Sequence, residues 1–351
     1  MIKVAIDGGD YLSTNSVSSG INRIIQAISG RSDKNPSIHY RVYSFNEKAD
    51  NRLPVIGYSE LFLPLNVLKD GSDVFLGLSA NIPTLIRHSR LKKILFVYDF
   101  GFLTYPAHYS NPGKMKKMID YGINNSDAII STSENTKKKL LNYYPAIKPD
   151  KVKVLRLGLD HLVKKKTNSP IGDPYFLYVG VIKPIKNLEK IFEIFSLFLS
   201  TTNKSHYRLV LIGKIEKKYH EELLKNSSFR KVKNNLIFYE NITDHELSAF
   251  YQHALAVLNY SLAEGFAFPP LEASVFQKPV FVNDLPVYHE YLKTFPNIRI
   301  IENPKLVADR LVSLSSKDSV TTGFIVPKEF TWTNFKTGLD KIIVSLGRKN
   351  I

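Results

Sequence analysis

The sequence predicts an α/β fold made of two doubly wound domains. Its 351 residues are many for one domain and comfortable for two, and with 44% hydrophobic residues the chain can bury a substantial core. In both halves, short apolar segments bounded by turn residues alternate with segments of helical periodicity. Between the halves, residues 164–174 (KKKTNSPIGDP) are polar, contain proline and show no periodicity, as expected of a linker. We therefore expect domains at 1–165 and 166–333.

The first half opens with a strand, a glycine-containing loop and a helix. Residues 2–7 (IKVAID) read as a buried strand, and a Ser/Gly loop leads into a helix with isoleucines spaced three and four apart from Ile21. The start of this helix, at Ser19 and Gly20, would present unpaired N–H groups to an anion. Further strands are predicted at 39–45, 73–78, 93–99 and 151–161, with helices between 114 and 144.

The second half repeats the pattern. Strands are predicted at 175–180 (YFLYVG) and 208–214, each followed by a helical segment, the second a charged one at 216–225. Residues 235–254 read as strand, turn and helix, in which Thr243 and Glu246 would form a capping box. A last amphipathic helix is predicted within 330–347.

The stretch 259–274 (NYSLAEGFAFPPLEAS) carries the strongest chemical signal. Two glutamates, Glu264 and Glu272, stand eight positions apart; Gly265 permits a turn that a side chain would obstruct, and Pro269–Pro270 suit a helix start. Glu272 would then lie in the first helical turn. A strand end, loop and helix start of this kind offers backbone N–H groups and two carboxylates to one ligand. A surface loop with two solvated carboxylates is the alternative.

The string EGFAFPPLE resembles the E-x7-E motif of GT-B glycosyltransferases, family 4, whose common form reads EGFGLPPLE. The glycine, both prolines, the leucine and both glutamates match in place. The resemblance implies two Rossmann-like domains that face each other across a cleft, with the acceptor on the N-terminal domain and the nucleotide sugar on the C-terminal one. It also implies that the final helix, 334–351, crosses back to the N-terminal domain.

Roles for the glutamate stretch follow from the same resemblance. Glu264 would orient the sugar and stabilise charge at the anomeric carbon, and Glu272 would accept hydrogen bonds from the ribose hydroxyls. The residues between them would offer backbone amides to the diphosphate or the sugar: Phe266, Ala267 and Phe268.

Other donor contacts are implied by weaker matches. The segment YVG…KN places Lys186 on the donor diphosphate, with backbone amides near Gly20 assisting. Val181 stands where many relatives have an arginine; Lys183 either compensates or is a surface lysine. Ile242 would lie against the nucleotide base or belong to the core.

The acceptor side departs from the family pattern. In the segment that resembles "HD…YP…Y", Tyr98 replaces the histidine, so a histidine-based role is in doubt. Asp99 remains as a candidate base or acceptor-orienting group, and a strand-end aspartate that caps the next loop is the alternative.

Composition excludes several classes of site. The chain has no cysteine, its nine histidines show no metal-like spacing, and it has no D-x-D motif. We expect no metal and no cofactor, only a nucleotide diphosphate sugar as substrate. No apolar run reaches membrane-spanning length, and the first residues enter directly as a strand without a leader, which predicts a cytoplasmic protein.

The net charge of +16 favours anionic partners, but no nucleic-acid-binding motif is present. Lysines interleaved with Met, Leu and Tyr at 114–144 suit peripheral contact with an anionic membrane, and a solvated amphipathic face would look the same.

The reaction implied by the resemblance is retaining, metal-independent glycosyl transfer. The expected acceptor is a glycan or lipid-linked glycan in the biosynthesis of bacterial surface polysaccharide, such as an O-antigen, a lipopolysaccharide component, or a capsule. GDP-mannose is the first choice of donor. The alternatives are a sugar-nucleotide 2-epimerase on the same fold, a glycosidase, and a non-catalytic glycan- or lipid-binding module.

Overall fold

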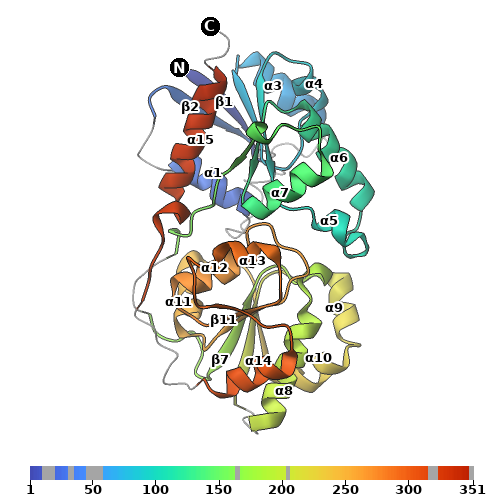
Figure 1. Cartoon of the computed structure of the whole chain (residues 1–351), viewed down its shortest axis with the longest axis vertical. Coiled ribbons are helices and arrows are strands. Elements are labelled where there is room, and N and C mark those ends of the chain that lie inside the picture. The colour runs from blue at the N-terminus through green and yellow to red at the C-terminus, as the bar shows by residue number, and fades with distance from the viewer. Residues whose placement is uncertain are drawn as a thin grey trace. The chain divides into compact units, whose positions relative to one another are not determined.

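The computed structural model describes residues 1–9, 20–30, 35–44, 58–162, 167–202, 206–314 and 323–347. It divides into two compact units, each with its own parallel sheet (Figure 1). The first unit comprises Met1–Leu103, Ser110–Gly158 and Glu329–Ile351, and the second comprises Thr104–Tyr109 and Leu159–Lys328. The boundary predicted near residue 166 falls among residues 163–166, outside the described residues.

The first unit contains a six-stranded, all-parallel sheet in the order β2-β1-β3-β4-β5-β6. Its strands are β1 (Ile2–Asp7), β2 (Ile38–Tyr43), β3 (Val74–Gly77), β4 (Lys92–Val97), β5 (Ala128–Ser131) and β6 (Val152–Val154). The four residues of β3 and of β5 are all buried, which explains their continuous apolar sequence. Only three residues of the predicted strand 151–161 join the sheet, as the edge strand β6. The chain leaves the sheet after the Leu155 N–H donates to the Ser131 carbonyl.

Helices cover this sheet. The helices and single turns are α1 (Gly20–Gly30), η1 (Tyr58–Phe62), α3 (Leu63–Lys69), α4 (Thr84–Arg87), α5 (Gly101–Thr104), α6 (Pro112–Asn125), α7 (Glu134–Tyr143), η3 (Pro149–Lys151) and α15 (Trp332–Gly347). The turn η2 (Pro106–His108) belongs to the second unit. In α1, Ile24, Ile25 and Ile28 are buried, as their spacing predicts. Ser133 caps α7 by accepting the Thr136 N–H.

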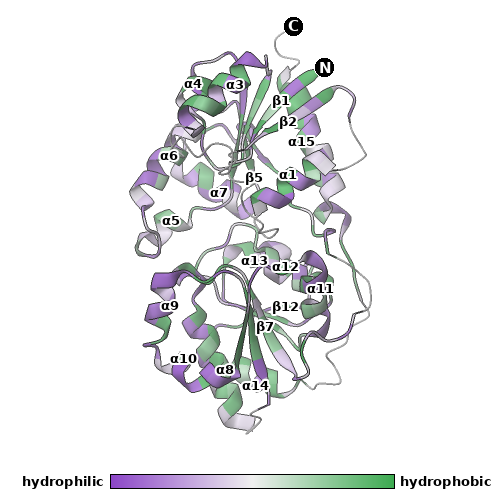
Figure 2. Cartoon of the chain, turned by 180° about the vertical axis from the view of Figure 1, so that it is seen from behind, coloured by the Kyte–Doolittle hydropathy of each residue, from purple (hydrophilic) through white to green (hydrophobic). Residues whose placement is uncertain are grey.

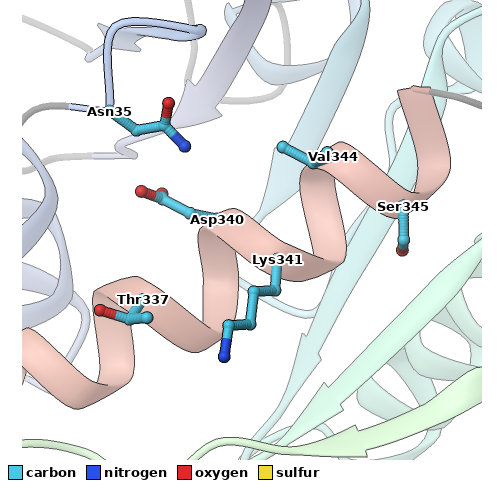
Figure 3. Close-up of a pocket in the computed structure, with 6 residues that line it drawn as sticks. All are labelled: Asn35, Thr337, Asp340, Lys341, Val344 and Ser345. Carbon is cyan, nitrogen blue, oxygen red and sulfur yellow. The ribbon is translucent and has the colours of Figure 1, made fainter.

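The last helix of the described chain belongs to the first unit. In Figure 1, α15 (red) lies beside α1 and β2 (blue), which come from the opposite end of the sequence. Tyr40 of β2 donates its hydroxyl hydrogen to Asp340, and Lys336 lies 2.9 Å from the same carboxylate. Figure 3 shows Asp340 at the edge of a cavity of about 430 Å³ opposite Asn35.

The second unit contains another six-stranded parallel sheet, in the order β12-β11-β10-β7-β8-β9. Its strands are β7 (Tyr175–Val179), β8 (Arg208–Ile212), β9 (Leu236–Tyr239), β10 (Val257–Asn259), β11 (Val280–Val282) and β12 (Ile298–Ile300). Two parallel sheets with helices confirm the predicted α/β fold class of two doubly wound domains. Hydrophobic residues follow the strands of both sheets (Figure 2).

Helices of the second unit enclose an aromatic core. They are η4 (Pro184–Lys186), α8 (Leu188–Thr202), α9 (Lys217–Leu223), α10 (Ser227–Val232), η5 (Lys233–Asn235), α11 (Asp244–His253), α12 (Phe268–Val275), α13 (Pro286–Tyr291), α14 (Pro304–Val312) and η7 (Lys328–Phe330), the last at the junction of the units. Phe176 of β7 packs edge-on against Phe195 and Phe198 of α8. The predicted capping box is present at the start of α11. Among the described residues, no helix combines the length and apolar character needed to span a bilayer.

Candidate functional site

The second sheet has a topological switch point beside β7. Strands β8 and β9 continue to one side of β7 and strands β10, β11 and β12 lie on the other. In open parallel sheets, ligands bind outside the carboxyl ends of the strands at such a point. The segments that leave β7 and β10 there contain Lys186 and Glu264 respectively.

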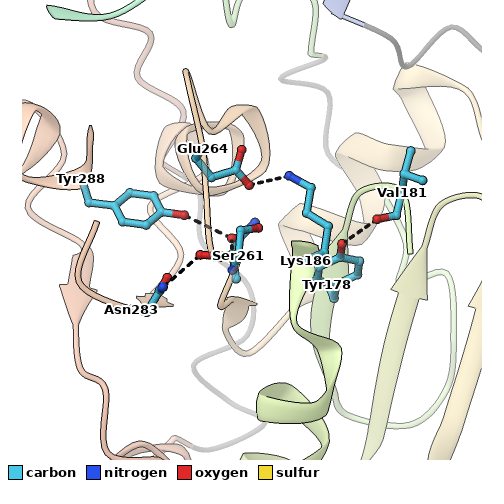
Figure 4. Close-up of polar contacts among 8 residues, drawn as sticks. Tyr178, Val181, Lys186, Ser261, Glu264, Asn283 and Tyr288 are labelled. Atoms are coloured by element: carbon cyan, nitrogen blue, oxygen red, sulfur yellow. Dashed lines mark hydrogen bonds and ion pairs between the residues drawn. The ribbon is translucent and has the colours of Figure 1, made fainter. Parts of the chain in front are cut away.

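Lys186 and Glu264 meet directly at this edge. The Lys186 Nζ lies 2.6 Å from Glu264 Oε1, and the two side chains are 20% and 10% exposed (Figure 4). Charge-assisted hydrogen bonds of this length are among the stronger ones in proteins. The structure therefore joins two of the three predicted catalytic residues into one ion pair.

The segment between β10 and Glu264 is fixed by side chains from other elements. The Asn187 amide donates to the Tyr260 carbonyl at 3.2 Å, and the Asn283 amide donates to the Ser261 carbonyl at 2.9 Å. Asn187 adopts the left-handed conformation (φ 51°), which asparagine tolerates, directly after Lys186. Neither Asn187 nor Asn283 was given a role from the sequence, since each bonds a partner at least 22 positions away.

Two buried tyrosines face the same region. Tyr288 donates to Asn259 Oδ1 at 3.1 Å, and Tyr178 donates to the Val181 carbonyl at 3.1 Å. Burial, and after it the negative charge of Glu264, raises the pKa of both phenols well above the usual value. The phenols thus stay neutral beside the ion pair.

Two polar atoms beneath the ion pair have no hydrogen-bond partner among the described residues. They are the Ser261 Oγ and the Asn283 Oδ1, both inaccessible to solvent. Buried polar groups are normally paired, and exceptions mark functional or hydrated sites. This edge of the sheet therefore has capacity for further hydrogen bonds.

Glycines shape the ends of β7 and β8. Gly180 and Gly213 have φ angles of 140° and 144°, which side chains rarely adopt. A Cβ on Gly213 would lie 2.1 Å from the Gly180 carbonyl oxygen. Val181, which stands where many relatives have an arginine, follows Gly180 and is 44% exposed.

The loop from Glu264 into α12 differs from prediction in two details. Its left-handed residue is Ala267 (φ 62°), whereas Gly265 has no positive φ, so the turn that we assigned to Gly265 lies two residues later. The helix begins at Phe268, before the two prolines, so Glu272 lies in the second turn and not in the first. Phe266 is buried against Phe268, with ring centroids 4.9 Å apart.

Glu272 is 3% exposed and is held by two side chains that the sequence did not reveal. His161 Nε2 lies 2.9 Å from Oε1, and the Tyr251 hydroxyl donates to Oε2 at 2.8 Å. These two contacts fix the orientation of the carboxylate. His161 lies 111 residues away in sequence, which hid this contact.

Two further predicted donor residues of the second unit are Lys183, three residues before Lys186, and Ile242. The Lys183 ammonium is 5.9 Å from the centroid of the Tyr109 ring. Ile242 is half-buried in the turn between β9 and α11. Neither position decides between its functional and its structural interpretation.

Gly20, Tyr98 and Asp99 belong to the first unit. Gly20 is the first residue of α1. Asp99 Oδ1 accepts the Gly101 N–H at 2.7 Å, which bears out the loop-capping alternative as a structural role. The hydroxyl of Tyr98 is buried, which raises its pKa, and it has no partner among the described residues.

A buried aspartate at the carboxyl end of β1 was missed. Asp7 is 6% exposed, accepts hydrogen bonds from Gly9 and Ser79, and has a pKa raised by burial. It lies at the switch point of the first sheet, between β1 and β3. The sequence signal was its place as the last residue of the first strand.

Similarity to known proteins agrees with the site's geometry. Residues 161–320, which include Lys186, Glu264 and Glu272, match the model of the family described as "Glycosyl transferases group 1". These residues belong to that family. The resemblance inferred from EGFAFPPLE is thereby confirmed.

The most informative curated relative is the O-antigen chain mannosyltransferase RfbU of Salmonella typhimurium. It is 23% identical over 256 residues, which are 72% of this chain and 68% of RfbU. Together with the family match, this supports a glycosyltransferase role for the chain.

Solved structures show the GT-B fold. Anabaena HepE, crystallised with UDP-glucose, aligns with a TM-score of 0.70 at 12% identity, covering 98% of this chain and 100% of HepE. A UDP-N-acetylglucosamine 2-epimerase, described as putative, from Listeria monocytogenes aligns with a TM-score of 0.61 at 14% identity, covering 100% of this chain and 98% of the epimerase. The fold alone therefore does not separate transfer from epimerisation.

Proposed function

We propose that this glycosyltransferase moves a sugar, with retention of anomeric configuration, from a nucleotide diphosphate sugar to a glycan or lipid-linked glycan acceptor. The observation that carries the proposal is the Lys186–Glu264 pair at the switch point of the second sheet. The mannosyltransferase relative favours GDP-mannose as donor and bacterial O-antigen or related surface polysaccharide as product.

The chemistry assigns one charge to each end of the breaking bond. Departure of a diphosphate leaves negative charge on its oxygens and positive charge at the anomeric carbon. Lys186 would stabilise the first and Glu264 the second, and their 2.6 Å contact holds the two groups side by side. The backbone N–H groups of Phe266, Ala267 and Phe268 would supply further stabilisation of the diphosphate, because Pro269 and Pro270 in the first turn of α12 have no N–H.

Glu272 has a binding role in this proposal. Its carboxylate is oriented by His161 and Tyr251 and would accept hydrogen bonds from the ribose. A retaining hydrolase instead needs two carboxyl groups flanking one bond, about 5 Å apart. The fixed attachment of Glu272 to His161 and Tyr251 favours transfer over the glycosidase alternative.

Metal independence is also part of the proposal. Among the described residues, no three His, Asp or Glu side chains form a group suited to a metal ion. Lys186 and backbone amides would instead stabilise the negative charge of the departing diphosphate. Transfer should therefore proceed at an unchanged rate when a chelator replaces magnesium, and loss of transfer with the chelator would refute this point.

The melting temperature of the protein across nucleotides tests the donor class. A ligand at a hundred times its dissociation constant that binds only the folded state adds about 2.7 kcal/mol. Among GDP, UDP, dTDP, ADP and CMP, we expect GDP alone to raise the melting temperature, with and without magnesium. A shift with UDP alone would overturn the choice of GDP-mannose, and no shift with any nucleotide would favour a non-catalytic glycan-binding module.

Product analysis separates transfer from epimerisation. We expect the product to carry the donor's anomeric configuration and to require the acceptor. Formation of a new sugar nucleotide without acceptor would instead identify a 2-epimerase.

A further inference from the structure

The first unit exposes an apolar stripe along α3. Leu61, in the turn η1 that leads into α3, and Leu65 and Leu68 of α3 are 55%, 51% and 40% exposed, and their spacing of four and three residues places them on one side of the helix. The opposite face, which contains Leu63 and Val67, is buried.

This clustering distinguishes α3 from the rest of the described surface. Phe62, before α3, and Leu85, on the neighbouring α4, are also exposed, at 45% and 39%. The exposed large hydrophobic residues of the second unit are instead spread over several elements, for example Leu224 and Leu306. Isolated apolar side chains are ordinary on a protein surface, whereas a contiguous group marks an interaction site.

A cavity with a basic border continues the stripe. Leu68 lines a cavity of about 500 Å³ at the amino ends of β1, β3 and β4, whose polar lining includes Ser72, Asp73, Ser89, Arg90 and Lys92. Arg90 is exposed and has no ion pair among the described residues. Guanidinium and hydroxyl groups at the end of an apolar stripe suit a phosphate attached to an acyl chain.

The carboxylates near the cavity leave Arg90 without an ion-pair partner among the described residues, while Asp127 pairs with Lys92 at 3.5 Å. Asp70 is paired with Arg41 at 2.7 Å, and Asp73 accepts the backbone N–H of Lys3 at 2.8 Å. Glu60 accepts the first N–H of α4 at 3.0 Å. The chain as a whole carries a net charge of +16, which adds long-range attraction to an anionic surface.

We propose that the α3 stripe (Leu61, Leu65 and Leu68) and its basic cavity dock the protein on a bilayer that contains anionic phospholipids. Leucines enter the interface between headgroups and acyl chains, while Arg90 meets lipid phosphate. The cavity lies at the amino edge of the first sheet, so docking leaves the carboxyl edge accessible. The proposal names a different surface from residues 114–144, where the sequence placed a membrane patch.

Binding to vesicles tests the proposal independently of the proposed function, because it needs neither donor nor acceptor. The full chain is sedimented with vesicles of phosphatidylcholine alone, or with one part phosphatidylglycerol to two parts phosphatidylcholine. We expect binding to the mixed vesicles only. Leu65→Glu/Leu68→Glu should weaken it by at least about tenfold, since a tenfold loss corresponds to ~1.4 kcal/mol and burial of two half-exposed leucines exceeds that.

Matched variants exclude non-specific effects. Leu224→Glu/Leu306→Glu changes equally exposed leucines of the second unit and should affect binding less than the stripe variant does. Arg90→Glu should weaken binding by about tenfold, and Arg230→Glu, an equal change of charge at an exposed site on α10, by less. Circular dichroism and melting temperature confirm that each variant is folded.

Three outcomes would overturn the proposal. The first is wild-type protein that binds neither vesicle, and the second is a stripe variant that binds like wild type. The third is a larger loss of vesicle binding in Lys114→Glu/Lys117→Glu, on α6, than in the stripe variant, which would assign membrane contact to residues 114–144. If the stripe variant instead abolishes a concentration-dependent dimer and leaves vesicle binding unchanged, the stripe is a self-association surface.

Discussion

At Gly213 the backbone conformation and a close neighbour both require glycine. Its φ of 144° and the carbonyl of Gly180 leave no room for a side chain. At the neighbouring strand end the same conformation at Gly180 lets Tyr178 bond the Val181 carbonyl. Both glycines therefore determine where the segment from β7 to Lys186 runs.

Gly213→Ala should destabilise the second unit by about 3 kcal/mol or more, because the new Cβ overlaps a backbone oxygen at a φ unsuited to alanine. Denaturant unfolding of wild type and variant measures this. Gly172→Ala is the matched control: no atom lies within 4 Å of the place that the new methyl group would take, and the φ of Gly172 is not positive, so the change should stay within about 0.5 kcal/mol. Equal stability of the two variants would contradict the assigned backbone geometry.

Residue contacts also show what the sequence could and could not predict. Lys186, Glu264 and Glu272 were found because their motifs are contiguous and distinctive. Their surroundings were not: His161 and Asn283 stand in unremarkable local sequence, and the YVG…KN segment that contains Asn187 does not indicate its contact with the Tyr260 carbonyl. Local propensity likewise placed the turn at Gly265, whereas tertiary contacts put Ala267 in the left-handed conformation.

At the level of elements, α15 depends on a buried polar cluster. Lys336 and Asp340 have side chains that are only 6% and 12% exposed, and Tyr40 of β2 donates to the same carboxylate. Breaking a buried pair by removing one partner leaves the other charge uncompensated. The cluster therefore attaches α15 to the first sheet in one register.

Asp340→Ala should destabilise the protein by about 3 kcal/mol, the lower end for a buried pair, because it leaves the Lys336 ammonium without its carboxylate partner. Lys341→Ala, at the adjacent exposed position, should change stability by less than about 0.5 kcal/mol. Urea unfolding followed by circular dichroism checks both. An Asp340 variant as stable as wild type would show that packing alone holds α15.

Most elements were predictable because strand and helix periodicities are strong in both halves of the chain. The predicted strand 151–161 was too long, since apolar character continues beyond β6 while the hydrogen-bonding partner strand does not. The start of α12 was predicted one residue too late. Its N-cap residue, Ala267, is in the left-handed conformation and has no side chain that could cap the helix. Boundaries of this kind depend on neighbours that a local pattern does not contain.

At the scale of the whole molecule, buried tyrosines dominate the expected response to alkaline pH. Burial raises the pKa of many phenols above the ordinary value near 10: Tyr40, Tyr98, Tyr175, Tyr178, Tyr219, Tyr260 and Tyr288. In the unfolded chain these groups lose protons near pH 10, while in the folded protein they keep them.

The folded state therefore binds more protons above pH 10. The stability that these phenols contribute is fully present below that pH and falls above it, by about 1.4 kcal/mol per pH unit for each phenol. We expect the melting temperature to drop steeply between about pH 10 and pH 11. Titration of most phenols near pH 10 in the folded protein, seen by phenolate absorbance, would contradict this.

The central claim is that Glu264 acts in sugar transfer at the switch point of the second sheet. The most direct test is the transfer rate of Glu264→Gln with the donor whose nucleotide raises the melting temperature, compared with Glu193→Gln, a half-exposed glutamate of α8. We predict that Glu264→Gln loses about 10²- to 10³-fold in rate while the nucleotide still raises its melting temperature, and that Glu193→Gln matches wild type. A Glu264→Gln protein that retains a transfer rate within about tenfold of wild type would contradict the account.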